Sequence, residues 1–195
     1  MIKRLFDLVV SAIALVILSP LLLVISLLVK KDGGPAFYRG KRVARGGGLF
    51  DMLKFRTMVI DAEKIGGSST PDDDPRITRV GKFLRRTKLD ELPQLINVLR
   101  GEMSFVGPRP QVKWVVDLYS PEERRVLTVR PGITDYASLK FNNEGEILRG
   151  STDPDKDYFE KIHPEKMRLS LKYVDESSIF VDVRIILQTL RAIVR

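Results

Sequence analysis

The longest apolar run of the chain lies at its start. Between Leu5 and Val29 the one charged residue is Asp7. A straight helix over this stretch reaches about 37 Å at about 1.5 Å per residue, whereas the hydrocarbon core of a bilayer is about 30 Å thick. Lys30 and Lys31 follow without a signal-peptidase pattern, so we expect the segment to be retained and to hold the protein at a membrane.

Ser19 and Pro20 interrupt this apolar run near its middle. Pro20 removes a backbone donor and its ring presses on the carbonyl of Val16, while the hydroxyl of Ser19 can bond back to Leu15. A sharp bend is therefore expected at this pair. Each arm of the bent helix is then too short to cross a bilayer.

Basic pairs flank the apolar run on both sides. Lys3 and Arg4 precede it, and Lys30 and Lys31 follow it. The positive-inside rule places both ends on the cytoplasmic face, which favours a re-entrant hairpin over residues 1–32. A kinked helix that spans the membrane accounts for the pattern equally well, because proline is common in such helices. The two topologies remain open.

The remaining residues, 33–195, predict one compact unit of short helices and a small hairpin. Strand-like residues from Phe37 and a strand at Leu49–Met58 flank a turn at Arg45–Gly48, and a polar loop covers Ile65–Pro75. Helices are expected at Ile77–Arg86, from Asp90 as N-cap to Leu99, at Val112–Tyr119, Pro121–Leu127, Asp155–Ile162 and Phe180–Arg195, with a tight turn at Phe105–Pro110 and a loop at Arg130–Thr134. The expected class is α/β, mostly helical, and the first and last of these helices are amphipathic enough to lie at a membrane interface.

The amino-acid composition limits the kinds of partner and of catalytic group that the chain can have. The 195 residues carry 33 lysines and arginines against 25 acidic residues, a net charge of +8, which suggests an anionic partner such as nucleic acid, phospholipid or a phosphorylated substrate. Cysteine is absent, which excludes disulfides and thiolate chemistry. The single histidine, His163, makes a Ser-His-Asp relay or a histidine metal site very unfavourable, and no glycine-rich nucleotide loop is present.

Asp90 and Glu91 form the strongest candidate site. Adjacent carboxylates at a helix start lie where backbone donors stabilise negative charge, so a nucleophile and a metal ligand side by side are chemically reasonable there. An Asp-Glu pair in isolation more often serves as a cap and a dipole partner. The flanking cations favour the first interpretation: Lys54, Arg56, Arg76, Arg79, Arg85, Arg86, Arg109 and Arg130 lie on turn-rich backbone, and arginine forks suit diphosphate oxygens. Arg109 is the strongest of them, because Gly107, Pro108 and Pro110 fix it.

The sequence resembles the bacterial sugar transferase family, the monotopic polyprenyl-phosphate phosphoglycosyl transferases. The resemblance covers nearly the whole chain and is densest in five ordered motifs: Lys54–Met58, Asp74–Thr78, Leu89–Leu95, Met103–Pro110 and Arg130–Thr134. It implies a re-entrant membrane helix bent at a Ser-Pro pair, joined to a catalytic domain on the cytoplasmic face of the bacterial inner membrane.

The resemblance also implies a two-step reaction. Asp90 attacks the sugar-linked phosphate of a UDP-sugar, UMP leaves, and polyprenyl (undecaprenyl) phosphate then takes the phosphosugar. Glu91 helps to bind Mg²⁺, and Arg85, Arg109, Lys54, Arg56 and Arg130 position phosphates. Such a product begins the assembly of an exopolysaccharide, O-antigen, capsule or glycoprotein. Membrane lipid is an expected partner, nucleic acid is not, and a homodimer remains open.

One motif departs from the family pattern. Many members continue Pro-Gly-Ile-Thr with Gly-Leu-Ala-Gln and a downstream arginine, whereas this chain reads Asp135-Tyr136-Ala137-Ser138 and has no arginine in the next few positions. Lys140 and Arg149 are candidate substitutes. The identity of the sugar is therefore open.

Two other classes of function compete with transfer. A membrane-anchored basic module that binds nucleic acid or acidic lipid needs neither Asp90 nor Mg²⁺. A metal-dependent phosphohydrolase acting on a lipid diphosphate uses the same carboxylates but consumes no UDP-sugar.

Overall fold

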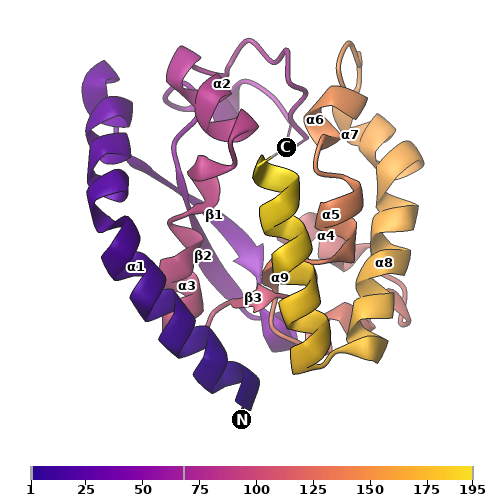
Figure 1. The fold of residues 1–195 in the computed structure, drawn as a ribbon. Coiled ribbons are helices and arrows are strands. Elements are labelled where there is room, and N and C mark those ends of the chain that lie inside the picture. Colours follow the sequence, from indigo (N-terminus) through magenta and orange to yellow (C-terminus); the bar gives the residue numbers. More distant parts are fainter. Residues whose placement is uncertain (1, 68, 195) are drawn as a thin grey trace.

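The computed structural model describes residues 2–67 and 69–194, in which helices surround a central hairpin (Figure 1). The strands are β1 (Phe37–Val43), β2 (Leu49–Phe55), β3 (Ser104–Val106) and β4 (Gly132–Thr134). The helices are α1 (Ile2–Val29), α2 (Arg79–Arg86), α3 (Gln94–Arg100), α4 (Lys113–Asp117), α5 (Tyr136–Lys140), α6 (Glu144–Ile147), α7 (Pro154–Asp157), α8 (His163–Glu176) and α9 (Ile179–Val194). The expected class, a mostly helical α/β fold with a small hairpin, is confirmed.

Helix α1 runs without interruption through Pro20. The N–H that Pro20 lacks would donate to the carbonyl of Val16, and the hydroxyl of Ser19 donates to that same carbonyl over 2.8 Å. Ser19 thus supplies the hydrogen bond that Pro20 removes, and its acceptor is Val16 rather than Leu15. The ribbon of α1 curves along its length (Figure 1). Whether it forms a re-entrant hairpin in a bilayer stays a prediction.

Both ends of α1 are fastened to the same compact domain. Near its start, the guanidinium of Arg4 donates to the carbonyls of Val98 over 2.6 Å and Leu99 over 2.9 Å, which belong to the last turn of α3. At its end, the carbonyl of Val29 accepts a hydrogen bond of 3.1 Å from Arg56. The last carbonyls of a helix carry partial negative charge, which makes them good acceptors for arginine. The domain therefore extends along the whole of α1.

The start of α1 also contacts the C-terminal helices. Lys3 forms an ion pair with Asp182 of α9, and its ammonium donates to the carbonyl of Val106 over 3.0 Å and to the hydroxyl of Tyr173 over 3.2 Å. The Asp182 side chain is only 2% exposed, and it also accepts a hydrogen bond of 2.7 Å from the hydroxyl of Tyr173. The first turn of the apolar helix is thereby tied to β3, α8 and α9.

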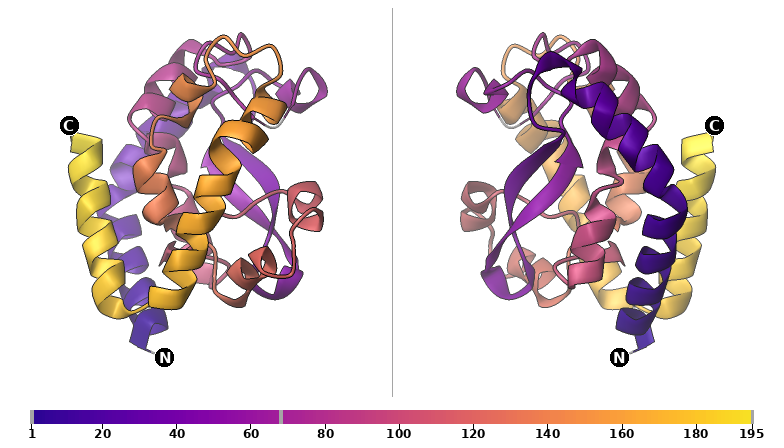
Figure 2. Two further views of the ribbon diagram at one scale, coloured as in Figure 1. Left: turned by 90° about the vertical axis from the view of Figure 1, so that its right-hand side faces the viewer. Right: turned by 90° about the vertical axis from the view of Figure 1, so that its left-hand side faces the viewer.

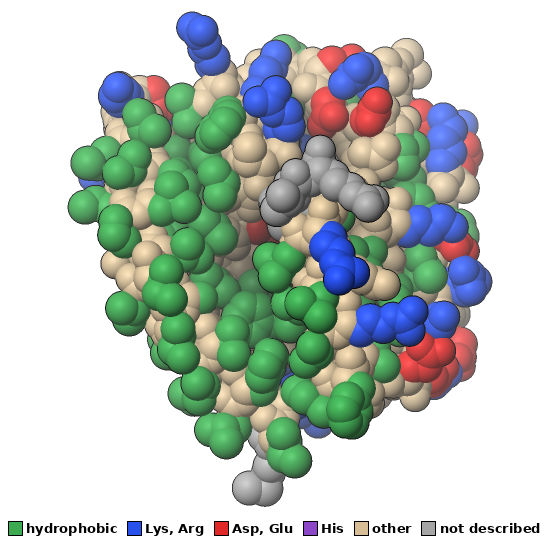
Figure 3. Space-filling view, viewed as in Figure 1, with side chains coloured by type: hydrophobic (Ala, Val, Ile, Leu, Met, Phe, Trp, Pro, Cys, Tyr) green, Lys and Arg blue, Asp and Glu red, His purple; other side chains and the backbone are tan. Residues whose placement is uncertain are grey.

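The outer sides of α1 and α9 are apolar. Figure 3 shows hydrophobic side chains over both helices, and Figure 2 shows the two helices on the side of the molecule opposite the hairpin. The exposed side chains on α1 include Ile2, Leu5, Ile13, Val16, Ile17, Leu23, Val24 and Leu27, and those on α9 include Phe180, Leu187 and Leu190. Helix α1 is long and apolar enough to cross a membrane, and 11% of its most apolar window is buried within the protein. This surface, called the apolar face below, has the composition expected of a membrane anchor, and the interfacial position of the last helix stays a prediction.

The hairpin brings Lys54 to the centre of the molecule. Strands β1 and β2 pair in antiparallel register from Phe37 with Phe55 to Val43 with Leu49, as expected. Asn97 of α3 locks this hairpin in place, because its side chain accepts from the backbone N–H of Leu53 over 2.9 Å. Its amide also donates to the carbonyl of Asp51 over 2.8 Å. Helix α3 and strand β2 thus form one rigid support.

A parallel pair of strands replaces the turn and the loop expected at Phe105–Pro110 and Arg130–Thr134. Ser104 pairs with Gly132 and Val106 with Thr134. The two segments cross so closely that a Cβ on Gly107 would lie 2.3 Å from the carbonyl oxygen of Arg130, which only glycine tolerates. Helix α8 was not predicted, although Pro164 in its first turn and the helical spacing of Met167, Leu171 and Val174 are local signals for it. These pairings place the backbone of Arg109.

Candidate active site

Asp90 and Glu91 lie in a single 3₁₀ turn, Leu89–Glu91, between α2 and α3. Helix α3 begins at Gln94, after Pro93, so the expectation that Asp90 caps it is wrong. The turn is set by Lys88, whose backbone is left-handed with φ 57° and ψ 13°. Among the described residues the Asp90 carboxylate accepts no hydrogen bond, although it is 5% exposed. A capping role would have occupied this carboxylate, and the 3₁₀ turn leaves it available.

Glu91 is held by two cations. Arg109 donates to Oε1 over 2.5 Å from Nη2 and to Oε2 over 3.2 Å from Nη1. Lys54 donates to Oε1 over 2.9 Å, and its ammonium lies 3.9 Å from Oδ2 of Asp90. Lys54 therefore bridges the two carboxylates, whereas Arg109 is committed to Glu91. The structure brings together four of the predicted site residues: Lys54, Asp90, Glu91 and Arg109.

The surroundings push the pKa values of the two carboxyls in opposite directions. Burial raises the pKa of Asp90 above its ordinary value, and Lys54 opposes that rise. Burial alone would also raise the pKa of Glu91, but Arg109 and Lys54 together lower it well below the ordinary range. Glu91 in turn raises the pKa of Arg109. Two adjacent carboxyls with divergent pKa values are typical of sites that divide chemical roles between them.

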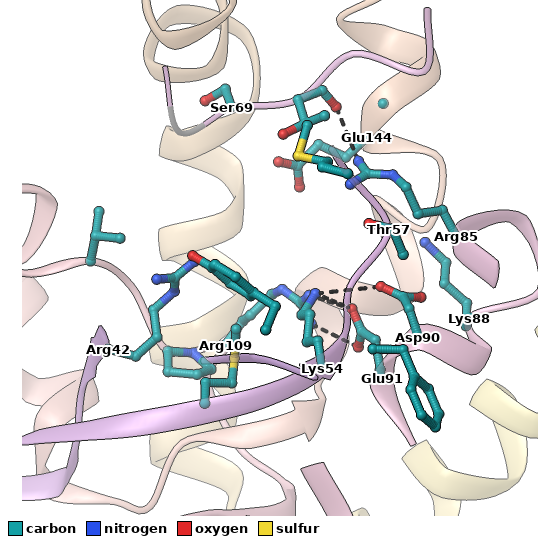
Figure 4. A pocket seen from close by; sticks show the side chains of 18 of the residues that line it. Arg42, Lys54, Thr57, Ser69, Arg85, Lys88, Asp90, Glu91, Arg109 and Glu144 are labelled. Atoms are coloured by element: carbon teal, nitrogen blue, oxygen red, sulfur yellow. Dashed lines mark hydrogen bonds and ion pairs between the residues drawn. The ribbon is translucent and has the colours of Figure 1, made fainter. Parts of the chain in front are cut away.

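The dyad lies in the wall of a large open cavity of about 2290 Å³. Figure 4 shows Arg85 and Lys88 on the same side of this cavity as Asp90, while Arg109 reaches Glu91 from the opposite side. Arg85 donates one long hydrogen bond of 3.4 Å, to the carbonyl of Thr70. The cavity extends from the dyad to Ile186, Thr189 and Leu190 of α9. It thus connects the carboxylates with a helix of the apolar face.

Two predicted phosphate contacts have other partners in the structure. Arg56, 8% exposed, forms an ion pair with Asp32 and donates to the carbonyls of Val29 and Pro35. Arg130 donates to the carbonyl of Gly101 over 3.0 Å, past the end of α3. Arg56 is among the residues that line the cavity, and Arg130 is not. Both side chains fasten the scaffold, and their role in phosphate binding stays a prediction.

Sequence reasoning missed other groups in the cavity wall. Lys88 stands two positions before Asp90, directly ahead of the Leu89–Leu95 motif, and only the geometry of its turn reveals where its side chain goes. Glu144 and Lys166 form an ion pair that also lines the cavity, and Lys166 lies 5.2 Å from the ring centre of Tyr158. These residues are distant in sequence, and no local pattern marks them as neighbours.

The donor set fits Mg²⁺ in its chemistry. Among residues 2–67 and 69–194 no group of three or more acidic or histidine side chains surrounds a single point. Magnesium is ordinarily held by one or two carboxylates together with substrate phosphates, and Asp90 and Glu91 supply such oxygens at the cavity. Glu91 would exchange part of its contact with Lys54 or Arg109 to bind the ion. The residues present therefore fit a metal that arrives with a diphosphate.

The family comparison decides what kind of protein carries this site. The sequence matches the family described as bacterial sugar transferase over residues 1–195. The chain belongs to the bacterial sugar transferase family. The expected resemblance is thus confirmed over the full length, including the apolar helix and the dyad motif.

Curated relatives of this sugar transferase carry informative names. The galactosyl transferase CpsE of Streptococcus agalactiae is 37% identical over 98% of this chain and 42% of its own length. The exopolysaccharide production protein ExoY of Rhizobium meliloti is 36% identical over 99% of this chain and 85% of its own length. A UDP-glucose:undecaprenyl-phosphate glucose-1-phosphate transferase of Caulobacter vibrioides is 37% identical over 96% and 67%. The chain spans less than half of CpsE, so it corresponds to one portion of that larger relative.

Proposed function

We propose that this protein transfers a phosphosugar from a UDP-sugar to undecaprenyl phosphate or a related polyprenyl phosphate, with release of UMP. The observation that carries the proposal is Asp90, a buried carboxylate with no hydrogen bond among the described residues, facing a cavity lined by Arg85, Lys88 and Lys54. Relatives named for undecaprenyl-phosphate sugar phosphate transfer support the same reaction.

The reaction proceeds in two displacements at one phosphorus. A carboxylate oxygen of Asp90 forms a bond to the phosphorus that carries the sugar, and the phosphorus–oxygen bond to UMP breaks, so UMP leaves with the electron pair. A phosphate oxygen of the polyprenyl phosphate then attacks the same phosphorus and expels the Asp90 carboxylate. The product is a polyprenyl-diphosphate-linked sugar, and Asp90 is regenerated.

Each neighbour has a defined task in this scheme. Lys54 opposes the rise that burial causes in the pKa of Asp90, and Arg109 holds Glu91 in place. Arg85 is directed at the cavity and binds phosphate oxygens. Glu91 would help to hold Mg²⁺, which offsets negative charge on the diphosphate and on the departing UMP.

The attachments of α1 support a re-entrant course and a cytoplasmic catalytic domain. Arg4 ties the start of α1 to α3, and Arg56 ties its end to β2, so both ends belong to one polar domain. A helix that crossed the bilayer would carry one of these attachments through the hydrocarbon core, where such polar contacts are costly. The apolar face then lies in one leaflet of the bacterial inner membrane, and its cavity opening gives a lipid phosphate access to Asp90.

The test is UMP release by the purified chain in detergent with Mg²⁺, polyprenyl phosphate and a panel of UDP-sugars. We expect UMP from at least one donor, and none above background from Asp90→Asn at equal folded concentration. Release of inorganic phosphate from a lipid diphosphate, without UMP from any donor, would instead identify a phosphohydrolase. UMP release that survives Asp90→Asn would remove Asp90 as the nucleophile.

A further inference from the structure

Lys88 has an unusual backbone for a lysine. Its φ of 57° lies in the left-handed region, and Asp61 is the other non-glycine residue with positive φ within the described ranges. The Cβ atom makes this conformation unfavourable for most residues. Glycine has no Cβ, and asparagine and aspartate tolerate the conformation better than other residues. Strained backbone that persists in a folded protein is concentrated at functional sites. A lysine at such a position therefore indicates that its side chain has a function.

The backbone of Lys88 is fixed on both sides. Its N–H donates to the carbonyl of Arg85 over 3.2 Å and so closes α2, and its own carbonyl accepts from the N–H of Glu91 over 3.2 Å and so closes the dyad turn. Such a helix-ending position is commonly glycine. Because the turn is defined by Arg85 and Glu91, the direction in which the Lys88 side chain leaves the backbone is coupled to the placement of the dyad.

The ammonium of Lys88 points into the cavity beside Asp90. Figure 4 shows it between Asp90 and Arg85. Within residues 2–67 and 69–194, no hydrogen bond or ion pair reaches it, whereas Lys54 and Arg109 are both engaged by Glu91. Among the described residues the charge of Lys88 is therefore unpaired, and an anion bound in the cavity would supply its partner.

We propose that the Lys88 ammonium contacts the sugar-linked phosphate of the donor, opposite Arg85, and stabilises the charge that develops on its oxygens during attack by Asp90. This inference rests on the proposed function and adds a catalytic residue to it. Lys88 remains protonated throughout, and the phosphorus–oxygen bonds form and break as described for the two displacements. The left-handed backbone directs the ammonium toward the phosphorus that Asp90 attacks. A right-handed backbone at position 88 would direct the side chain elsewhere.

Three substitutions separate the effect of the Lys88 charge from the effect of its backbone conformation. Lys88→Asn keeps a residue that tolerates the left-handed region but removes the charge, Lys88→Arg keeps the charge, and Lys88→Gly removes both the strain and the charge. Asp61→Gly is the matched control, because it makes the same backbone change at an exposed residue of the same cavity that pairs with Lys64 and not with the dyad. Each full-length variant is assayed in detergent for UMP release with the donor that the wild type uses, and for thermal unfolding.

We expect kcat of Lys88→Asn to fall by about 100-fold or more with a small change in KM, as for loss of one donor to a developing oxyanion. Lys88→Arg keeps the positive charge, so its kcat should stay above about a tenth of the wild-type value. The Tm of Lys88→Gly should equal or exceed that of the wild type although its activity is lost, and Asp61→Gly should keep its activity.

The inference is wrong if Lys88→Asn keeps a kcat within about threefold of the wild type, or if Lys88→Arg falls as far as Lys88→Asn. Wild-type protein that releases no Asp90-dependent UMP refutes the proposed function itself, whatever the Lys88 variants do. The wild type and Asp90→Asn, measured in the same experiment, therefore distinguish the two failures.

Discussion

Arg109 grips Glu91 with both ends of its guanidinium, at 2.5 Å from Oε1 and 3.2 Å from Oε2. This two-point contact fixes the second carboxyl of the dyad while the first, Asp90, accepts no hydrogen bond among the described residues. Arginine that is committed to a carboxylate positions it more strictly than lysine can, because its planar fork matches the two oxygens. The division of roles between Asp90 and Glu91 follows from this asymmetry.

The first prediction concerns Arg109→Lys. A lysine keeps one charge but loses the fork, and a charge-assisted hydrogen bond is worth about 1.5–3 kcal/mol, so UMP release should fall by about 10- to 100-fold. Arg100→Lys, at the exposed end of α3, is the matched control and should be close to wild type. Equal activity of Arg109→Lys and wild type would show that the two-point contact has no role in the reaction.

The second prediction is a shift in pH dependence. Asp90 must be ionised to attack, and burial raises its pKa above the ordinary 3.8, so UMP release should fall with decreasing pH through that raised value. Lys54 opposes the rise, so Lys54→Met should raise the pKa of Asp90 further and move the acid limb to higher pH. Lys156→Met, with a 66% exposed side chain, should leave the limb in place. A limb that stays put or moves to lower pH in Lys54→Met would contradict this electrostatic account.

The third prediction tests topology. Since the chain contains no cysteine, single cysteines at Ile2 and Lys31 report the location of each end of α1 without background. In intact bacterial spheroplasts, a membrane-impermeant maleimide should label neither position, and both should react after lysis. Labelling of Ile2→Cys alone from outside would establish a spanning helix and exclude the re-entrant course.

The fourth prediction concerns the attachment of α1 to α9. Lys3→Met leaves the 2% exposed Asp182 carboxylate without its cation; because the Lys3 side chain is itself 36% exposed, the expected loss is that of a charge-assisted hydrogen bond, about 1.5–3 kcal/mol of unfolding free energy. Lys113→Met breaks an exposed pair with Asp117 and should cost less than about 1 kcal/mol. Thermal or denaturant unfolding in detergent measures both. Equal losses would mean that the Lys3 contact does not stabilise the fold.

Local sequence patterns determined the regular elements. The apolar run up to Val29 forms α1, the alternating residues around a glycine turn form the β1–β2 hairpin, and the spaced apolar positions near the end form α9. Each of these follows from the period of a single segment and from its own backbone propensities. The sequence likewise determines that Asp90 and Glu91 are adjacent, because neighbours in the chain are neighbours in space.

Tertiary structure alone decided which polar residues meet. Arg56 and Arg109 were both predicted to bind phosphate, but packing buries Arg56 against the end of α1 and places Arg109 against Glu91. The pairing of β3 with β4, and the left-handed turn that directs Lys88, depend on contacts between segments far apart or on a single dihedral angle. Periodicity carries no information about such contacts, since their energy comes from surfaces that exist only after the chain has folded.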